Sequence, residues 1–296
     1  EGADVVFLGG WKNRDGEPLP MIIRKADGGF NYSTSDLACI IDRVERLECD
    51  QFLYVVGTPQ KQHFEMVFQV ARKAGFMDDG HSSIHVNFGS VLDTDGRVLK
   101  SREGEVIKLH DLLSEAVIRA NSAIEEKNPE LIGEQRNNVA SMVGIGAVKY
   151  ADLSTERTKD YVFEWEKMLS FEGNTAPYLQ YAHARICSIF RKWAGERSDI
   201  PDFEISCCEP EESNLARRLV RFPSALDETI STFSPHKLCT HLHSVASAFA
   251  SFYEACQVLG SGDEAVEKSR LALCDLTAKQ LELGLGLLGI GVPEKM

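Results

Sequence analysis

Side chains that could bind a small molecule follow three short apolar runs near the beginning of the chain. They are Tyr32 and Asp36 after residues 21–24, Gln60 after residues 52–56, and His85, Phe88 and Gly89 on or just after residues 84–88. In an open parallel sheet, ligands bind beyond the carboxyl ends of the strands, so these positions are the first candidates for a ligand site. Taken alone, Asp36 and Gln60 are also residue types that begin helices, and by themselves the residues favour that interpretation.

A basic loop with two glycines occupies residues 96–104, after the third apolar run. Its cations include Lys100 and Arg102, which could stabilise the negative charge that develops on a departing polyphosphate. Solvated hairpins often carry the same residue types, so the pattern alone leaves both interpretations open.

Two tyrosines and an arginine recur at steps of three and four residues in the second half of the chain, at Tyr178, Tyr181 and Arg185. On a helix they form a stripe beside the apolar core positions. Splayed RNA bases stack on aromatic rings and guanidinium planes, so the stripe could bind RNA. The alternative is the polar border of an amphipathic core.

The elements that must position the first group alternate between strand and helix. Residues 5–8, 21–24, 52–56 and 84–88 are predicted strands. A helix through residues 37–47 has Ser33, Thr34 or Ser35 as its predicted N-cap and Asp36 in its first turn, and a second covers residues 60–74. The order strand, helix, strand, helix, strand from residue 21 predicts a parallel sheet, half of a doubly wound nucleotide-binding fold.

After Leu109 the pattern indicates helices only, with residues 111–127 and 160–171 the clearest at first. Three strong amphipathic stretches follow from Pro177 onward, and the last of them, residues 265–288, is rich in leucine. Together they predict a helical bundle of about 120 residues, which is within the usual size of a domain.

Composition narrows the classes of protein. The chain has 296 residues and a net charge of -13, which argues against a protein that coats nucleic acid without specificity but allows a locally basic RNA site. Basic clusters occur at residues 191–192 and 217–221, where helix-surface charge is the alternative. The eight cysteines have no zinc-ribbon or Cys-x-x-Cys spacing, and His241 and His243 would point to different faces of a helix, so we expect no protein-bound metal.

No apolar run approaches the ~20 residues that span a bilayer, and residues 1–11 do not resemble a signal peptide. We therefore expect no membrane partner and a cytoplasmic protein, with an organelle as the alternative. The chain begins with Glu1 and runs almost at once into a predicted strand, so we expect a piece of a larger protein.

Several ordered motifs resemble the arginyl-tRNA synthetase family. They are residues 22–38 (IIRKADGGFNYSTSDLA), 60–64 (QKQHF), 85–89 (HVNFG), 143–150 (VGIGAVKY), 174–186 (NTAPYLQYAHARI) and 292–296 (VPEKM). They cover nearly the whole chain, and several motifs in the expected order are far more specific than one short signature.

The resemblance implies a class I ligase that uses ATP, with Mg²⁺ as its counter-ion, to attach arginine to its tRNA through arginyl-adenylate. It implies that Tyr32, Asp36 and Gln60 bind arginine, and a carboxylate can form a planar fork with the guanidinium. It also implies that His85, Phe88 and Gly89 lie against adenine. Tyr178, Tyr181, Arg185, Tyr253 and Met296 would meet the anticodon loop.

Two departures from the class pattern matter. Lys100 and Arg102 stand where class I enzymes carry the Lys-Met-Ser-Lys-Ser loop, but an arginine replaces the second lysine and Glu103 adds an opposing charge. The other class signature, His-Ile-Gly-His, is absent from the sequence. We therefore expect half of the ATP site to lie outside this chain, which alone would be inactive.

The predicted architecture is α/β plus all-α. Residues 1–109 would form the C-terminal half of a Rossmann-like class I catalytic domain, residues 110–172 a connecting helical region, and residues 173–296 an α-helical anticodon-binding bundle. The expected partners are arginine tRNA, arginine and ATP, and we expect a monomer. The alternative function is a non-catalytic tRNA-binding module.

Overall fold

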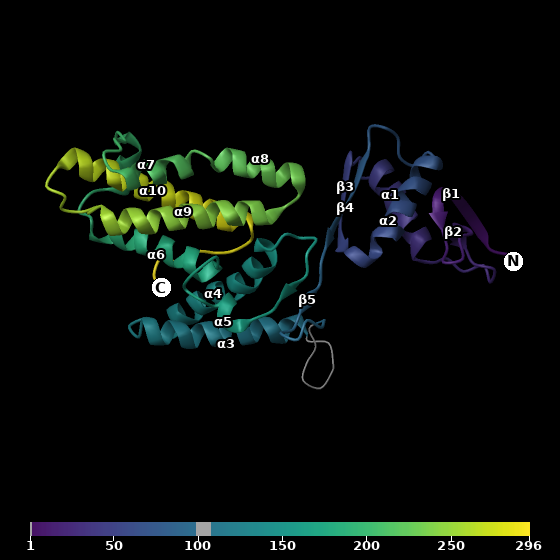
Figure 1. Ribbon diagram of the computed structural model, residues 1–296, viewed down its shortest axis with the longest axis horizontal. Coiled ribbons are helices and arrows are strands. Elements are labelled where there is room, and N and C mark those ends of the chain that lie inside the picture. The colour runs from purple at the N-terminus through teal and green to yellow at the C-terminus, as the bar shows by residue number, and fades with distance from the viewer. Residues whose placement is uncertain (1, 99–107) are drawn as a thin grey trace. The chain divides into compact units, whose positions relative to one another are not determined.

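The structure is a computed structural model that describes residues 2–98 and 108–296. Lys100 and Arg102 lie outside the described residues. The chain divides into two compact units, Glu1–Ser90 and Val91–Met296 (Figure 1).

The first unit contains both strands and helices. Its elements are β1 (Asp4–Lys12), β2 (Pro18–Arg24), α1 (Tyr32–Glu45), β3 (Gln51–Gly57), a 3₁₀ turn η1 (Thr58–Gln60), α2 (Lys61–Lys73) and β4 (Ser82–Phe88). Each of the four predicted strands lies within one of these strands. The helix predicted for residues 60–74 is α2, and Gly75 follows it with a positive φ of 76° that suits glycine.

The expected sheet is only partly present. β3 and β4 pair in parallel, from Gln51 opposite Ser82 to Gly57 opposite Phe88. β2 instead pairs antiparallel with β1, so the prediction of a parallel sheet that begins with residues 21–24 is wrong. The reason is local: the backbone N–H of Asn13 donates to Glu17 O over 2.8 Å in a tight turn, and a tight turn makes successive strands antiparallel neighbours.

One apolar core joins the helices of this unit to its strands. Phe52 and Tyr54 of β3 face it, whereas Leu53 and Val55 point the other way, as the alternation of a strand requires. α1 contributes Leu37 and Ile40, and α2 contributes residues that include Phe64, Val67, Val70 and Ala71. The core therefore fixes the beginnings of both helices relative to the ends of β2 and β3.

The start of α1 differs from the sequence prediction. Its N-cap is Asn31, whose side chain accepts from the backbone N–H of Thr34, and not Ser33, Thr34 or Ser35. Asp36 consequently lies beyond the first turn, which contains no acidic residue. Asp36 is therefore too far along α1 to serve as the charge at its N-terminus.

The second unit is almost entirely helical. Its elements are β5 (Val91–Leu92), α3 (Leu109–Lys127), α4 (Gly133–Ser154), β6 (Tyr161–Val162), α5 (Trp165–Met168), α6 (Ala176–Lys192), η2 (Arg197–Asp202), α7 (Pro210–Leu219), α8 (Phe222–Thr232), α9 (Pro235–Ala255) and α10 (Glu264–Leu287). The three amphipathic stretches predicted from residue 177 onward correspond to α6, α9 and α10.

The helix predicted over residues 160–171 is wrong. Tyr161 and Val162 pair in parallel with Val91 and Leu92, and the N–H of Phe163 donates to Leu92 O over 2.8 Å. Only Trp165–Met168 is helical in this segment. The β-branched and aromatic run Tyr-Val-Phe suits a strand, and pairing with a distant segment could not be inferred from local periodicity.

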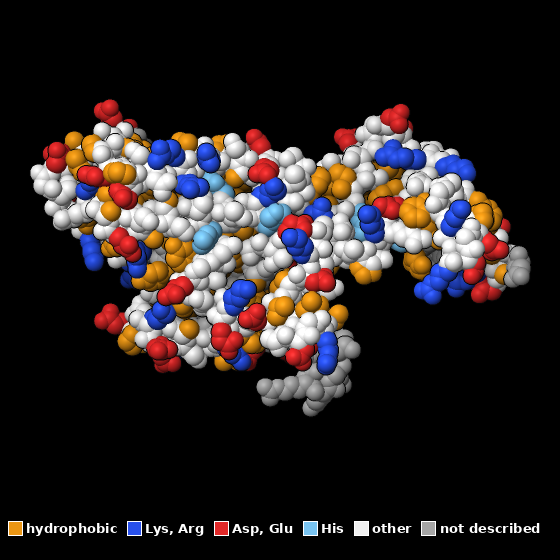
Figure 2. Space-filling view, viewed as in Figure 1, with side chains coloured by type: hydrophobic (Ala, Val, Ile, Leu, Met, Phe, Trp, Pro, Cys, Tyr) orange, Lys and Arg blue, Asp and Glu red, His pale blue; other side chains and the backbone are white. Residues whose placement is uncertain are grey.

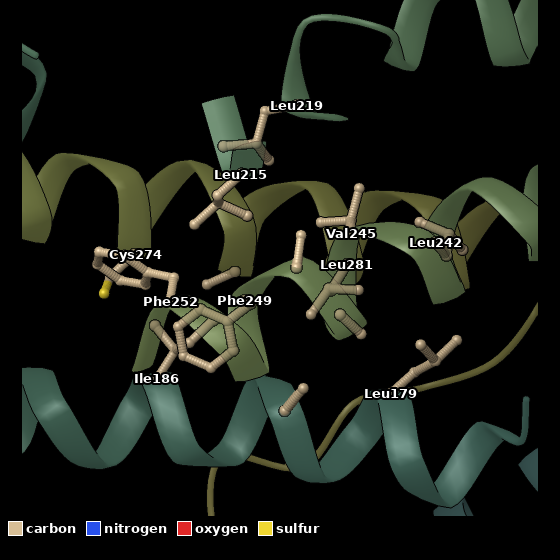
Figure 3. Packing of buried hydrophobic residues seen from close by; sticks show 14 of the residues in the cluster. Leu179, Ile186, Leu215, Leu219, Leu242, Val245, Phe249, Phe252, Cys274 and Leu281 are labelled. Carbon is tan, nitrogen blue, oxygen red and sulfur yellow. The ribbon is translucent and has the colours of Figure 1, made fainter. Parts of the chain in front are cut away.

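α6, α9 and α10 enclose the main core of this unit. Figure 3 shows Ile186 of α6, Phe249 and Phe252 of α9 and Cys274 of α10 packed together, and all four are buried. α7 adds Leu215 and Leu219 to the same core. The buried faces of α6 and α9 are mostly apolar, so polar side chains that could bind a ligand lie on their outward faces.

None of the helices in residues 2–98 and 108–296 combines the length and the apolar character that a membrane span requires.

Candidate functional site

Tyr32 and Asp36 lie one turn apart on α1 and meet a third residue, His63 of α2. His63 Nε2 lies 2.6 Å from Asp36 Oδ2. The ring of Tyr32 meets the ring of His63 edge-on, with centroids 4.8 Å apart. Tyr32 is 69% exposed, so this group has an open side where a ligand could cover the ring.

The charge of Asp36 is left largely unmatched inside the protein. Among the described residues, no lysine or arginine nitrogen forms an ion pair with it, and His63 is its one ion-pair partner. Its side chain is 29% exposed, and that of His63 is 16% exposed. A half-buried carboxylate of this kind can accept a cationic ligand through charge-assisted hydrogen bonds.

Tyr54 of β3 contacts the same helix, α1. There Arg43 Nη1 donates to the Tyr54 hydroxyl over 2.7 Å. Burial raises the pKa of the Tyr54 hydroxyl, while the Arg43 guanidinium acts in the opposite direction. The phenol is therefore neutral at physiological pH and adds no charge beside Asp36.

Gln60 is the N-cap of α2 and precedes His63 by three residues, so both lie at the start of one helix. Its side chain makes no capping hydrogen bond and is exposed, which leaves its amide available to a ligand. The structure thus places Tyr32 and Asp36 in the first two turns of α1 and Gln60 at the start of the adjacent helix α2.

The residues around the end of β4 are held differently. His85 Nε2 donates to Val56 O over 2.9 Å, and its Nδ1 is buried without a hydrogen-bond partner among the described residues. Phe88 is 45% exposed, and Thr58 Oγ1 donates to its backbone oxygen over 2.9 Å. Gly89 follows β4 directly. The side chain of His85 thus stays against β3, whereas Phe88 offers an exposed ring.

The basic loop is described only at its beginning. Asp93 Oδ1 accepts from the N–H groups of Asp95 and Arg97, and the N–H of Gly96 donates to Asp93 O over 3.0 Å. Val98 then bridges to Leu92.

A second group of site residues gathers in the helical unit around Arg185 of α6. Arg185 Nη2 donates to Tyr181 Oη over 2.8 Å. Its Cζ lies 4.7 Å from the ring centroid of Tyr181 and 5.2 Å from that of Tyr253 on α9. Both rings are partly exposed, at 38% and 40%. The guanidinium therefore holds two aromatic faces at one surface.

Two cavities border this group, and Arg185 and Ser188 line both. One of about 370 Å³ is also lined by Tyr181, Asn128, Arg191, Lys295 and Met296. The other, of about 350 Å³, is also lined by Tyr253, Lys192 and Gln257.

The cations at these cavities are Arg185, Arg191, Lys192 and Lys295, and within the described residues none of them forms an ion pair. On the face shown in Figure 2, by contrast, acidic and basic side chains are interspersed. The cavities are thus locally cationic in a chain whose net charge is -13.

Tyr178 lies apart from this cluster. It packs against the main core, and its ring centroid is 5.7 Å from that of His243 on α9. Tyr178 and Tyr181 are three residues apart and so lie on the same side of α6, but different residues pack against them: Tyr178 meets His243, whereas Tyr181 meets Arg185 and Phe171.

The last residues of the chain are held beside α6. Gln180 Nε2 donates to Gly291 O over 2.7 Å, and Arg191 Nη1 donates to Glu294 O over 2.9 Å. Asn128 Nδ2 donates to Met296 O over 3.2 Å, and the Met296 side chain joins a small core between α3 and α4. These contacts bring Met296 to the cavity beside Tyr181 and Arg185.

Sequence reasoning did not single out His63, although it lies in the quoted motif at residues 60–64. Its position at helical spacing from Gln60 was the available signal. The contribution of the α3 side was also missed: Asn128 follows α3 by one residue and reaches the C-terminal segment.

Across the described ranges, no group of three His, Cys, Asp or Glu side chains is placed to hold a metal ion. His241 hydrogen-bonds Gln280 over 3.1 Å, and His243 packs against Tyr178.

Two family models match the chain. The model of the class I tRNA synthetase (R) catalytic domain matches residues 1–165, and the model of the DALR anticodon binding domain matches residues 179–296. The first match covers Tyr32, Asp36, His63 and Gln60, and the second covers Tyr181, Arg185 and Tyr253. The chain therefore has a class I catalytic portion followed by a helical anticodon-binding domain, as the sequence predicted.

Individual relatives agree with the family models. The chain is 50% identical over 297 residues to an arginine–tRNA ligase of Cellvibrio japonicus and 47% identical over 296 residues to one of Proteus mirabilis, with 100% of this chain and 51% of each relative covered. The chain thus spans about half the length of these relatives.

Solved structures give the same picture. The Thermus thermophilus arginyl-tRNA synthetase has a TM-score of 0.85 at 27% identity, covering 100% of this chain and 54% of that one. The Plasmodium falciparum arginyl-tRNA synthetase has a TM-score of 0.82 at 30% identity, covering 99% of this chain and 50% of that one. On its motifs, its family models and these relatives, the chain belongs to the arginyl-tRNA synthetase family of class I tRNA synthetases.

Proposed function

We propose that this chain is part of an arginine–tRNA ligase. In the first step, the carboxylate of arginine attacks the α-phosphorus of ATP, which forms arginyl-adenylate and releases pyrophosphate. In the second step, a hydroxyl of the terminal tRNA ribose attacks the arginyl carbonyl, and AMP leaves. The observation that carries this proposal is the partly exposed Asp36 carboxylate in the second turn of α1, with no lysine or arginine paired to it among the described residues.

Asp36 would bind the guanidinium group of arginine. A guanidinium presents a planar fork of N–H donors that matches a carboxylate, whereas lysine is a point charge and citrulline is neutral. Tyr32 would cover the aliphatic part of the substrate with its exposed ring, and the free amide of Gln60 would add a polar contact. This arrangement selects for charge and shape together.

ATP would bind near the end of β4. Phe88 offers an exposed ring for the adenine base, Gly89 permits its close approach, and His85 would support the strand end from within. Lys100 and Arg102 would steady the departing pyrophosphate, because fixed cations act most strongly where negative charge develops. Mg²⁺ would arrive as the counter-ion of ATP.

The helical unit would bind the anticodon loop of arginine tRNA. Tyr181 and Tyr253 would stack bases, Arg185 and Met296 would border the base cavities, and Tyr178 would contribute from the neighbouring face. We propose that residues 1–109 belong to catalysis, residues 110–172 connect, and residues 173–296 bind tRNA. We further propose that this chain alone forms no adenylate, because its sequence lacks a His-Ile-Gly-His signature.

A second candidate function is tRNA binding without catalysis. It is favoured by one observation: Tyr181, Arg185, Tyr253 and Met296 all lie within the unit Val91–Met296, so the proposed tRNA surface needs no residue from the first unit.

A charging assay separates the two candidates. The purified full-length protein is incubated with ATP, total tRNA and either labelled arginine or labelled lysine, and label in acid-precipitable tRNA is counted. Ligase function predicts tRNA charged with arginine and not with lysine. A protein that binds tRNA but charges it with neither amino acid would support the second candidate.

A further inference from the structure

His63 lies between the two halves of the proposed arginine site. It contacts the carboxylate of Asp36 and the ring of Tyr32 on α1, and it follows Gln60 by one turn at the start of α2. The ring is only 16% exposed. No other described side chain forms a hydrogen bond or ion pair with Asp36.

The direction of the hydrogen bond follows from the chemistry of the carboxylate. An ionised carboxylate can only accept, so Nε2 of His63 carries the proton and donates it to Asp36 Oδ2 over 2.6 Å. The His63 ring is itself held by two neighbours, because its centroid lies 4.8 Å from that of Tyr32 and 5.0 Å from that of the buried Phe64. The donor is therefore rigid.

A rigid donor matters for a bidentate contact. The terminal torsion of an aspartate side chain is broad, so an unrestrained carboxylate samples many planes. A guanidinium fork requires the carboxylate to lie in one plane with it. One bond from His63 uses one of about four lone-pair sites on the two oxygens and leaves the others for the substrate.

We propose that His63 is a positioning residue that orients the Asp36 carboxylate for the guanidinium group of arginine. The inference rests on the proposed function of Asp36. His63 does not touch the reacting carboxyl group in this account, and its effect falls on the binding of arginine and not on the chemical step. In binding sites generally, a residue that contacts the ligand is held in its orientation by a hydrogen bond from a neighbouring residue, and His63 would do the same for Asp36.

The test uses full-length protein with the substitutions H63A, H63Q and D36A, and with Q62A as the matched control on the same helix turn. Gln62 is exposed, so its truncation leaves the site intact. KM for arginine and kcat are measured in tRNA charging at saturating ATP and tRNA. Loss of the hydrogen bond in H63A is expected to raise KM by about tenfold, with kcat changed much less. Glutamine can place its amide N–H near the position of Nε2, so H63Q is expected to recover most of the loss.

Three outcomes would decide against the inference. If H63A leaves KM for arginine unchanged while D36A raises it, His63 does not position Asp36, and the proposed function stands. If H63A and H63Q both raise KM, lower kcat and lower thermal stability together, His63 is only part of the core. If D36A also leaves KM unchanged, the arginine site itself is misassigned, and the roles proposed for Asp36 and for His63 both fail although the protein still charges tRNA with arginine.

Discussion

Arg185 organises the proposed tRNA surface at the level of single residues. Its guanidinium lies against the rings of both Tyr181 and Tyr253, which come from two different helices. Because the two rings are already held in place, RNA binding would lose less free energy to the ordering of these side chains. A base that stacks on either ring would find it already in place.

The first prediction concerns these rings. In titrations of labelled arginine tRNA with the purified chain, Y181A and Y253A should each weaken binding by about 1–3 kcal/mol for a base that loses its stacking partner. Y178A serves as a comparison, because Tyr178 contacts His243 and the core and not Arg185. Its effect should be smaller. Equal binding by Y181A, Y253A and the parent chain would show that the rings are only a core border.

The sequence named candidate residues for each proposed site but not the contacts that support them. Tyr32, Asp36 and Gln60 could be named because they follow strands or match a motif. The pairing of Asp36 with His63 could not, because it joins residues 27 positions apart whose proximity depends on how α1 packs against α2. Likewise, Tyr178 and Tyr181 share a periodic stripe, yet Tyr178 contacts His243 of α9, whereas Tyr181 contacts Arg185 and Phe171.

At the level of elements, α3 and α4 cross closely at Gly144. A Cβ atom at this position would lie 2.6 Å from Ala116 O and 2.7 Å from Val117 N. Both neighbours belong to the backbone of α3 and cannot rotate aside. The glycine in the motif at residues 143–150 is therefore explained by the packing of two helices.

The second prediction follows from this crossing. G144A should lower the free energy of unfolding by about 1–3 kcal/mol, because the methyl group forces the helices apart. G286A is the control: Gly286 is also helical, a Cβ atom there would have no described neighbour within 4 Å, and alanine should leave stability equal or slightly higher. Urea unfolding followed by circular dichroism measures both. A G144A variant as stable as the parent would contradict the close crossing.

The start of α7 is held by a buried charge. Glu212 is 1% exposed and accepts from Arg270 Nε over 2.6 Å and from the N–H groups of Cys208 and Glu209 over 2.7 and 2.9 Å. Burial acts to raise the pKa of Glu212, but the Glu209 N–H, Arg270 and the Cys208 N–H together hold it below its ordinary value.

The third prediction is a dependence of stability on pH. A carboxylate whose pKa is lowered by folding stabilises the protein above its unfolded pKa of 4.5, and this contribution is lost as pH falls through the lower folded pKa. At pH 7, E212Q should therefore be less stable than the parent by about 2 kcal/mol. The difference should shrink as pH falls below 4.5. E211Q, one residue away and outside this network of hydrogen bonds, should show little difference at any pH. If E212Q were less stable than the parent by the same amount at every pH, the ionic role of Glu212 would be contradicted.

Helices with strong periodicity were predicted well, because α2, α6 and α9 each bury one face against a core. The errors arose where pairing is not local. Tyr161 and Val162 form a strand only because Val91 and Leu92 lie beside them, and β2 leaves the expected parallel sheet because a tight turn returns it to β1. Neither pairing partner is visible in the periodicity of the segment itself.

At the level of the whole molecule, the two proposed binding functions belong to different units. The residues assigned to arginine lie in Glu1–Ser90, and those assigned to the anticodon lie in Val91–Met296. Because the two groups belong to separate units, the proposed arginine site and the proposed anticodon surface can each be substituted without changing a residue of the other.

The most direct test of the account is the arginine dependence of tRNA charging by full-length protein that carries D36A. The fourth prediction is that kcat/KM for arginine falls by an amount that corresponds to several kcal/mol of lost transition-state stabilisation. The reason is that the guanidinium loses its charged, bidentate partner. The binding of tRNA by the D36A protein should stay at the level of the parent protein. The Q62A protein, changed at an exposed residue of the neighbouring helix α2, is measured in parallel as the control. A D36A protein that charges tRNA with unchanged kcat/KM for arginine would contradict the account, since Asp36 would then serve only its contact with His63.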